Sequence, residues 1–129
     1  MDNTLLIIAY MPDLIMRSKL DVAARHYNIK TTVVSNIKGF TASLSKNAHT
    51  ILIDLDADQD ISIEMIHEAK KTDARVVGFC SHVLTDLMQK AREEGADMVY
   101  TNSTITAALP GIISEIAHTQ SNNSTPPKS

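Results

Sequence analysis

Short apolar runs alternate along the chain with segments of helical periodicity. The runs are rich in β-branched side chains and occupy residues 4–9, 31–35, 50–54, 75–79 and 97–101. Most of them are too uniformly apolar for a strand with one face in water. They are typical of strands that are buried on both faces of a parallel sheet. The alternation therefore predicts an α/β protein built from successive strand–helix units.

Each segment that follows a run carries apolar side chains at helical spacing. Pro12 suits the first turn of the first helix, and Gly95 is a natural residue just after the end of the fourth. Pro110 and Gly111 interrupt the last stripe and predict a kink there. The stripes are Met16, Leu20, Ala23 and Tyr27; Phe40, Leu44 and Ala48, after Gly39; Ile63, Ile66 and Ala69; Leu84, Leu87, Met88 and Ala91; and Ile105, Leu109, Ile112, Ile113 and Ile116.

Right-handed crossovers between such units give a doubly wound sheet, and the flavodoxin-like strand order 2-1-3-4-5 is the natural choice. Ligands of these folds bind at the carboxyl ends of the strands, near the switch point between strands 1 and 3. The candidate site residues are therefore those just after Ala9, Ile53, Phe79 and Thr101. The expected domain covers residues 1–118, and the polar residues 119–129, rich in Pro, Ser and Asn, are expected to form a disordered tail.

Charge and cysteine content narrow the class of protein. The 129 residues suit one domain, and twelve Lys and Arg against fifteen Asp and Glu give a formal charge of −3. This balance, without a basic run, argues against nucleic-acid binding. Cys80 is the single cysteine and cannot form an intramolecular disulfide, which favours a reducing, cytoplasmic setting. No apolar stretch approaches a membrane span, and the N-terminus lacks the basic region of a signal peptide.

Three stretches at the predicted carboxyl edge resemble the receiver domains of two-component response regulators, and the resemblance covers roughly residues 4–118. Residues 9–14, Ala-Tyr-Met-Pro-Asp-Leu, resemble the family's Asp-Asp-Glu-Pro-Asp-Leu. Residues 51–55, Ile-Leu-Ile-Asp-Leu, resemble its phospho-acceptor strand. Residues 95–103, Gly-Ala-Asp-Met-Val-Tyr-Thr-Asn-Ser, resemble its Gly-Ala-Asp-Asp-Tyr-Leu-Thr-Lys-Pro.

The resemblance implies a degenerate site. Of the family's functional positions, only the phospho-acceptor, which falls on Asp54, is kept. The remaining positions carry residues without the family's chemistry. The acidic pair that holds Mg²⁺ falls on Ala9 and Tyr10, the hydroxyl on Cys80, the aromatic switch on Val99, the lysine on Asn102 and the following proline on Ser103.

Loss of these groups argues against Mg²⁺-dependent phosphorylation. Mg²⁺ is usually held by one or two carboxylates together with substrate phosphate, and Asp54 alone makes a poor site. Phosphoryl transfer also depends on neutralising charge on the equatorial oxygens, and both neutralising cations are missing. Each lost group can cost about 2.7–4 kcal/mol of barrier, by analogy with a lost oxyanion donor. We therefore interpret Asp54 as a solvated carboxylate at the end of a strand.

Two further acidic features have simple explanations. Asp54, Asp56, Asp58 and Asp60 alternate as in an EF-hand, but Gln59 stands where that loop needs Gly and Met65 where it needs Glu. A solvated acidic loop, with a negative patch for a basic partner, is the better interpretation. Asp13 suits the start of a helix, where a carboxylate caps the backbone and favours the helix dipole.

Other chemistry has little support in the sequence. Cys80 has no Lys or Arg near it in sequence to lower its pKa, so a small half-buried thiol is the favoured interpretation. Ser81 is a candidate N-cap for the following helix, which His82 would enter. No Walker A, G-x-G-x-x-G or G-x-S-x-G motif occurs, and the histidines show no metal-ligand spacing. We expect neither an enzyme nor a bound cofactor or metal.

The sequence thus predicts a stand-alone pseudo-receiver that signals through protein–protein contact. By the resemblance, the face formed by helix 4, strand 5 and helix 5 would bind a protein partner or a second copy of the chain. It would include parts of residues 83–94, 98–101 and 104–118. Two alternatives remain open: a phospho-acceptor at Asp54 that relies on Asp13, Asp56 or a partner's residues, and a redox or small-molecule sensor around Cys80.

Overall fold

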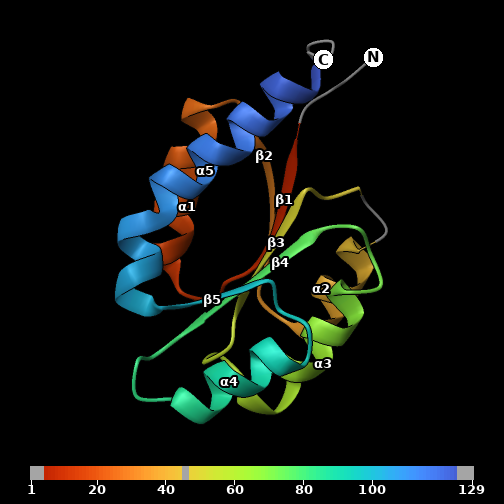
Figure 1. The fold of residues 1–129 in the computed structure, drawn as a ribbon, viewed down its shortest axis with the longest axis vertical. Coiled ribbons are helices and arrows are strands. Elements are labelled where there is room, and N and C mark those ends of the chain that lie inside the picture. The colour runs from red at the N-terminus through yellow and green to blue at the C-terminus, as the bar shows by residue number, and fades with distance from the viewer. Residues whose placement is uncertain (1–4, 45–46, 125–129) are drawn as a thin grey trace.

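The computed structural model describes residues 5–44 and 47–124, with the backbone alone for residues 119–124. Strands and helices alternate strictly in this part of the chain (Figure 1). The strands are β1 (Leu6–Tyr10), β2 (Lys30–Val34), β3 (Thr50–Asp54), β4 (Arg75–Cys80) and β5 (Met98–Thr101). The helices are α1 (Leu14–His26), α2 (Ile37–Ser43), α3 (Gln59–Ala69), α4 (Thr85–Glu93) and α5 (Asn102–Ser124).

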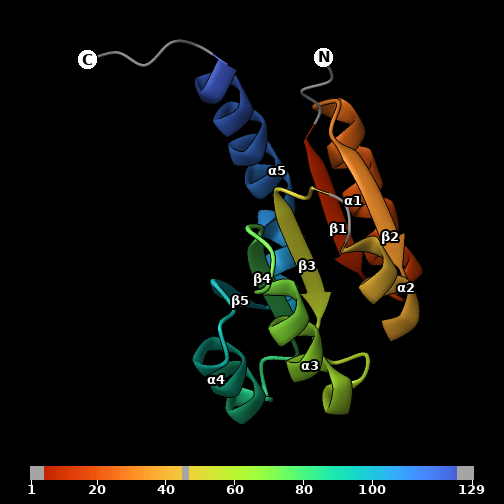
Figure 2. The ribbon, with the colours of Figure 1, turned by 90° about the vertical axis from the view of Figure 1, so that its right-hand side faces the viewer.

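The strands form one parallel sheet in the order β2-β1-β3-β4-β5. This topology confirms the predicted doubly wound α/β fold. Helices α1 and α5 cover one face of the sheet, and α2, α3 and α4 cover the other (Figure 1). All strands point the same way, so their carboxyl ends share one edge of the sheet (Figure 2). Within the described residues, no helix has the length and hydrophobicity needed to cross a membrane.

Two hydrophobic clusters fill the space on either side of the sheet. Successive residues of a strand point to opposite faces, so Ile8 packs beneath α2–α4 while its neighbour Ile7 packs beneath α1 and α5. The same alternation separates Ile51 and Ile53 from Leu52 in β3. Burial on both faces explains why β1, β3 and β4 are mostly apolar, whereas the edge strands β2 and β5 are more exposed and carry polar side chains.

Side-chain caps begin the first three helices. Asp13 accepts hydrogen bonds from the N–H groups of Ile15 and Met16, which confirms its predicted capping role. Asn36 and Asp58 cap α2 and α3 in the same manner. Pro12 therefore lies just before the cap of α1, outside the first turn in which the sequence placed it.

Two other predicted helix starts are wrong. Gly39 lies inside α2, because Asn36 caps the helix earlier than the Phe40 stripe suggested. Ser81 does not cap α4, which begins at Thr85 after Leu84, without a side-chain cap. Its hydroxyl instead accepts from the Val83 N–H at 3.4 Å, within a turn that includes His82. Gly95 does follow the end of α4, with a φ of 121° that glycine adopts readily.

Helix α5 is longer than the sequence predicted. It continues through Pro110 and on to Ser124, so part of the expected tail, residues 119–124, has a helical backbone. Its last turns extend past the start of β3 (Figure 2). Helix propagation costs little once packing has fixed the preceding turns. The rest of the expected tail, residues 125–129, lies outside the described residues.

Candidate functional site at the carboxyl edge of the sheet

Asp54 ends β3 at the middle of the carboxyl edge and is half-buried. Its Oδ1 accepts hydrogen bonds from the N–H groups of Asp56, at 3.0 Å, and Ala57, at 3.2 Å. These bonds close the turn that leads to α3. Burial raises the pKa of the Asp54 carboxyl, and the carboxylates of Asp56 and Asp13 raise it further, while the two backbone hydrogen bonds lower it. Asp54 is therefore a turn-forming carboxylate as well as the acceptor position.

Asp56 links its own turn, the loop after β4 and the start of α5 at this edge. Its Oδ2 accepts a hydrogen bond of 2.7 Å from the Ser81 N–H, in the loop after β4. The Asn102 side chain, at the start of α5, donates to the same oxygen at 3.5 Å. The sequence placed Asp56 only in a solvated acidic loop. It did not predict this bridge, because alternating aspartates do not reveal which one turns toward the neighbouring strands.

The positions of the family's acidic pair are occupied by core side chains. Ala9 is fully buried in the cluster beneath α1 and α5. Tyr10 is 4% exposed on the opposite face, with its ring edge-on to Phe40 at a centroid distance of 6.5 Å. Burial, followed by the carboxylates of Asp58 and Asp54, raises the pKa of the Tyr10 hydroxyl. Neither side chain can supply an oxygen anion to a metal.

The residues present do not fit a Mg²⁺ site. Mg²⁺ prefers near-octahedral oxygen coordination, usually with carboxylates in place before phosphate arrives. Among the described residues, no three His, Cys, Asp or Glu side chains converge in an arrangement that could hold a metal ion. Asp54 is present, but Ala9 and Tyr10, at the positions that would share a cation with it, are buried side chains without carboxylates.

Cys80 and Val99 also belong to the core rather than to an open crevice. Cys80 is fully buried and Val99 is 9% exposed, and both lie in the cluster beneath α2–α4 with Tyr10. Burial, reinforced by the carboxylates of Asp56 and Asp54, raises the pKa of the Cys80 thiol to about 11. The thiol is fully buried, more deeply than the half-buried position that the sequence predicted.

Ser103 lies in the exposed first turn of α5. Its hydroxyl is 3.4 Å from that of Thr101, which also accepts from the Thr104 N–H at 3.2 Å. Thr101 therefore stabilises the start of α5 through hydroxyl contacts. With Ser103 in place of the family's proline, this corner is held by polar contacts rather than by a ring.

A shallow cavity of about 210 Å³ opens beside Asp54, between α1 and α5. Asp13, Asp54, Lys19, Asn102 and Thr106 supply its polar wall. Its apolar lining is Ile15, Met16 and Phe79. The sequence did not single out Lys19 or Thr106. The helical spacing of Ile15 and Lys19 places both on one face of α1, but only the docking of α5 shows that this face borders the site.

A second cavity, of about 520 Å³, continues along the groove between α1 and α5. It shares Lys19 and Thr106 with the first cavity. The rest of its lining is Ser18, Val22, Ala23, His26, Tyr27, Leu109 and Pro110. The two cavities are therefore adjoining parts of one depression, polar near the sheet edge and more apolar along the helices.

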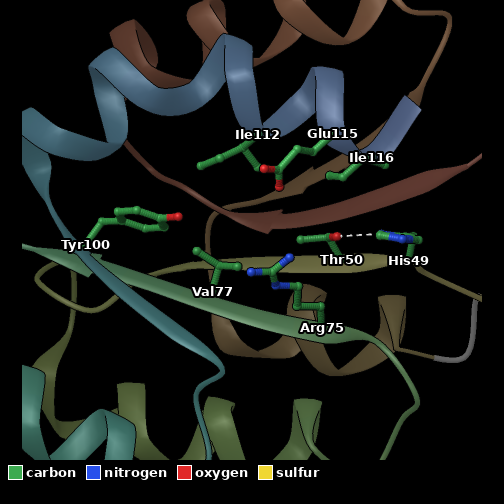
Figure 3. Close-up of a pocket in the computed structure, with 8 residues that line it drawn as sticks. All are labelled: His49, Thr50, Arg75, Val77, Tyr100, Ile112, Glu115 and Ile116. Atoms are coloured by element: carbon green, nitrogen blue, oxygen red, sulfur yellow. Dashed lines mark hydrogen bonds between the residues drawn. The ribbon is translucent and has the colours of Figure 1, made fainter. Parts of the chain in front are cut away.

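A third cavity lies at the opposite edge, where β3 and β4 begin, beneath α5 (Figure 3). Its volume of about 40 Å³ holds no more than about three water molecules. The His49 ring contacts the Thr50 hydroxyl at 2.7 Å. Burial, followed by the charge of Arg75, lowers the pKa of His49. Such a small polar space supports packing of α5 rather than ligand binding.

No protein-family model matches the sequence, and no curated protein is similar to it. Solved structures do match. A response regulator from Thermotoga maritima has a TM-score of 0.73 at 15% identity, over 89% of this chain and 98% of the other. A signal receiver domain from Bacteroides fragilis has a TM-score of 0.74 at 19% identity, over 88% and 97%.

A third match is a chain from a family of redox sensors in the streptococci that evolved from two-component response regulators. Its TM-score is 0.73 at 11% identity, over 96% of this chain but only 57% of that longer chain. The three matches agree with the strand order and helix placement described above. The chain therefore has the fold of a response-regulator receiver domain, of the CheY-like type.

Proposed function

We propose that the protein is a pseudo-receiver, which acts in signal transduction through contact with a protein partner and without Mg²⁺-dependent phosphorylation. The observation that carries the proposal is the identity of the side chains at the two positions where receiver domains have their acidic pair. Ala9 and Tyr10 occupy its positions and are buried in the cores on opposite faces of the sheet. A metal-binding pair cannot be recovered there by a change of rotamer, because the side chains lack carboxylates.

The charge balance around Asp54 supports the same conclusion. Asn102, at the position of the family's lysine, carries no charge and donates to Asp56. Without the metal and that lysine, a phosphoryl group on Asp54 would face the carboxylates of Asp13 and Asp56. Positioning and charge neutralisation supply most of the catalysis in phosphoryl transfer. Two lost groups at about 2.7–4 kcal/mol each slow the reaction by several orders of magnitude.

The proposed contact surface is the face formed by α4, β5 and α5, over parts of residues 83–94, 98–101 and 104–118. Strand β5 is an edge strand, so one of its sides has no strand partner within the described sheet. Met98 in β5 is 37% exposed, unusually open for a large apolar side chain of a strand. We propose that this face binds a protein partner or a second copy of the chain, in the cytoplasm.

An intact-mass assay with acetyl phosphate, with and without Mg²⁺, tests the loss of phosphorylation. We expect no phosphoryl adduct on the wild-type protein, and Asp54→Asn serves as the control. An adduct that requires both Mg²⁺ and Asp54 would overturn the proposal. It would favour the alternative of a phospho-acceptor that relies on Asp13, Asp56 or a partner's residues for metal and charge.

Sedimentation analysis tests the contact surface when the chain itself is the partner. We expect Met98→Glu to lower self-association and Asp54→Asn to leave it intact. Val22→Glu, at a residue that is 67% exposed on α1, is the matched control on the other face. Association that depended on Asp54 and not on Met98 would contradict the proposal.

The redox alternative has weaker support in this chain. One structural neighbour belongs to a family of redox sensors. A reactive thiol needs a lowered pKa and access to solvent. Cys80 has neither, since it is fully buried and its pKa is raised to about 11. A response to peroxide that Cys80→Ser abolishes would revive this alternative.

A further inference from the structure

The two adjoining cavities between α1 and α5, here called the α1–α5 trough, form one depression with two chemically different ends. Lys19 and Thr106 line both cavities and mark the boundary between them. The end at the sheet edge contains the carboxylates of Asp13 and Asp54. The other end contains Val22 and Leu109, among other residues. A ligand that spans both must therefore be amphipathic.

The position of the trough is one where doubly wound folds bind ligands. Its polar end lies at the carboxyl ends of the strands, beside the switch point between β1 and β3. The larger cavity, at about 520 Å³, is within the range of small-molecule sites, which are mostly apolar with a few placed polar groups. The smaller one, at about 210 Å³, has room for a polar head group.

Charge at the polar end selects the head group. Asp13 and Asp54 each use Oδ1 to accept backbone hydrogen bonds. Within the described residues, no group donates to Oδ2 of either carboxylate. Lys19 is the cation of this lining, so two carboxylates face one ammonium. The excess of negative charge favours a ligand that brings a positive charge of its own.

The apolar end provides contact area that no part of the described chain covers. Val22 is 67% exposed on α1, and Pro110 is exposed on the facing side of α5. Leu109 forms part of the floor and is itself buried in the core. From Ile15 to Val22 the helix rises roughly 10 Å, enough to follow a short alkyl chain or a single ring.

We propose that the α1–α5 trough binds a small amphipathic molecule with a protonated amine at one end and an apolar body. The amine pairs with Asp54 and Asp13, and the body lies against Val22, Leu109 and Pro110. This inference goes beyond the proposed function and is independent of it.

Titration of the full chain with n-hexylammonium chloride, followed by amide NMR, tests the site. We expect saturable shifts in residues 13–23, around Asp54 and in residues 102–110, with a Kd of about 1 mM, as befits so small a ligand. Hexanol, with the same apolar body and no charge, should bind more weakly. Hexanoate should bind more weakly still, because its charge repels the two carboxylates.

Three variants separate the two ends. Asp54→Asn should weaken hexylammonium binding by about fivefold, the factor of an exposed ion pair, and leave hexanol unchanged. Val22→Ser should weaken both ligands by about threefold, through lost apolar contact. Val83→Ser is the matched control, because Val83 is also 67% exposed but lines neither cavity. It should change neither affinity.

Three results would overturn the inference: shifts that do not saturate, equal binding of hexylammonium and hexanoate, or insensitivity to both Asp54→Asn and Val22→Ser. A titration with MgCl₂ tests the rival occupant. Saturation by Mg²⁺ without saturation by hexylammonium would assign the carboxylates to a metal instead. Failure here leaves the acetyl phosphate assay unaffected, so the two proposals stand or fall separately.

Discussion

The two faces of the sheet differ in how closely the helices pack over them. Beneath α2–α4, Tyr10, Phe40, Cys80 and Val99 form part of a continuous core. Above that core, His67 contacts Glu94, and Lys70 reaches Asp97 at 3.3 Å, so that α3 is tied to the end of α4 and the start of β5. The α1–α5 face also has a buried core, but it keeps an open trough.

The positions that resemble functional positions of receiver domains are divided between the two faces. Tyr10, Cys80 and Val99, which by the sequence resemblance stand at functional positions of the receiver family, contribute apolar packing to the α2–α4 face. Asp54 and Asn102 remain at the surface and line a cavity on the α1–α5 side. The α2–α4 face is therefore closed by packing at these positions, whereas the α1–α5 side has an open cavity beside Asp54.

The largest expected effect compares packing on the two faces. Phe40 is fully buried against Tyr10, and truncation to alanine should lower the free energy of unfolding by about 3–5 kcal/mol. Val22→Ala, at an exposed site of the trough, should change it by no more than about 0.5 kcal/mol. Urea denaturation measures both. Similar losses at the two sites would mean that the trough is closed in solution.

Thiol reactivity gives a second contrast between the faces. With a pKa of about 11, Cys80 should react with iodoacetamide at pH 8 about 200-fold more slowly than an ordinary exposed cysteine. Val22→Cys in a Cys80→Ala background supplies that exposed thiol. Intact mass over time gives both rates. Comparable rates would show that the α2–α4 core opens readily, and would return Cys80 to consideration as a sensor.

Most of the fold could be predicted from local sequence. The apolar runs located the strands to within about two residues, because burial on both faces makes β1, β3 and β4 mostly apolar. The predictions were wrong at helix starts, where capping hydrogen bonds decide which residue begins the helix. Asn36 starts α2 ahead of Gly39, and α4 begins after Leu84 without the expected help from Ser81. Such boundaries depend on single hydrogen bonds, which periodicity does not encode.

The site was less predictable than the fold. The sequence predicted that Tyr10, Asp54 and Cys80 lie at strand ends, and the structure places them at the last residues of β1, β3 and β4. The sequence missed the roles of Asp56 and Lys19, since both depend on contacts between segments far apart in the chain. Asp56 bonds to Ser81, and Lys19 borders Asp54 only because α1 and α5 lie against the same face of the sheet. Pairings of this kind arise from tertiary packing.

A third prediction concerns the polar contacts that close the α2–α4 face. Oδ2 of Asp97 accepts a hydrogen bond of 2.7 Å from the Val76 N–H and also faces Lys70. Asp97→Ala leaves that partly buried N–H unpaired and should cost about 1–3 kcal/mol in denaturant titrations. Lys70→Ala removes only the exposed ion pair and should cost no more than about 1 kcal/mol. Equal losses of stability in the two variants would mean that the ion pair, and not the hydrogen bond to Val76, accounts for the effect of Asp97→Ala.

The smallest expected effect is the pH dependence of Asp54. Its pKa is raised in the folded state, mainly by burial, so the folded protein holds this proton more tightly than the unfolded chain. The stability that protonation provides is fully present below the unfolded pKa, near 4, and is lost as the pH rises through the folded value. The amide of the Asp54→Asn variant cannot ionise, so the variant should keep this stability at every pH.

The variant should therefore be more stable than wild type at pH 7, by less than about 1 kcal/mol, and the difference should shrink toward pH 3. Thermal unfolding across this range measures the difference. Asp73→Asn, at an exposed position outside the helices and strands, should show no such trend. A variant less stable than wild type at pH 7 would mean that the hydrogen bonds from Asp56 and Ala57 to the ionised carboxylate outweigh its burial. The ionised Asp54 carboxylate would then stabilise the turn between β3 and α3, and the negative charge beside the α1–α5 trough would follow from that role.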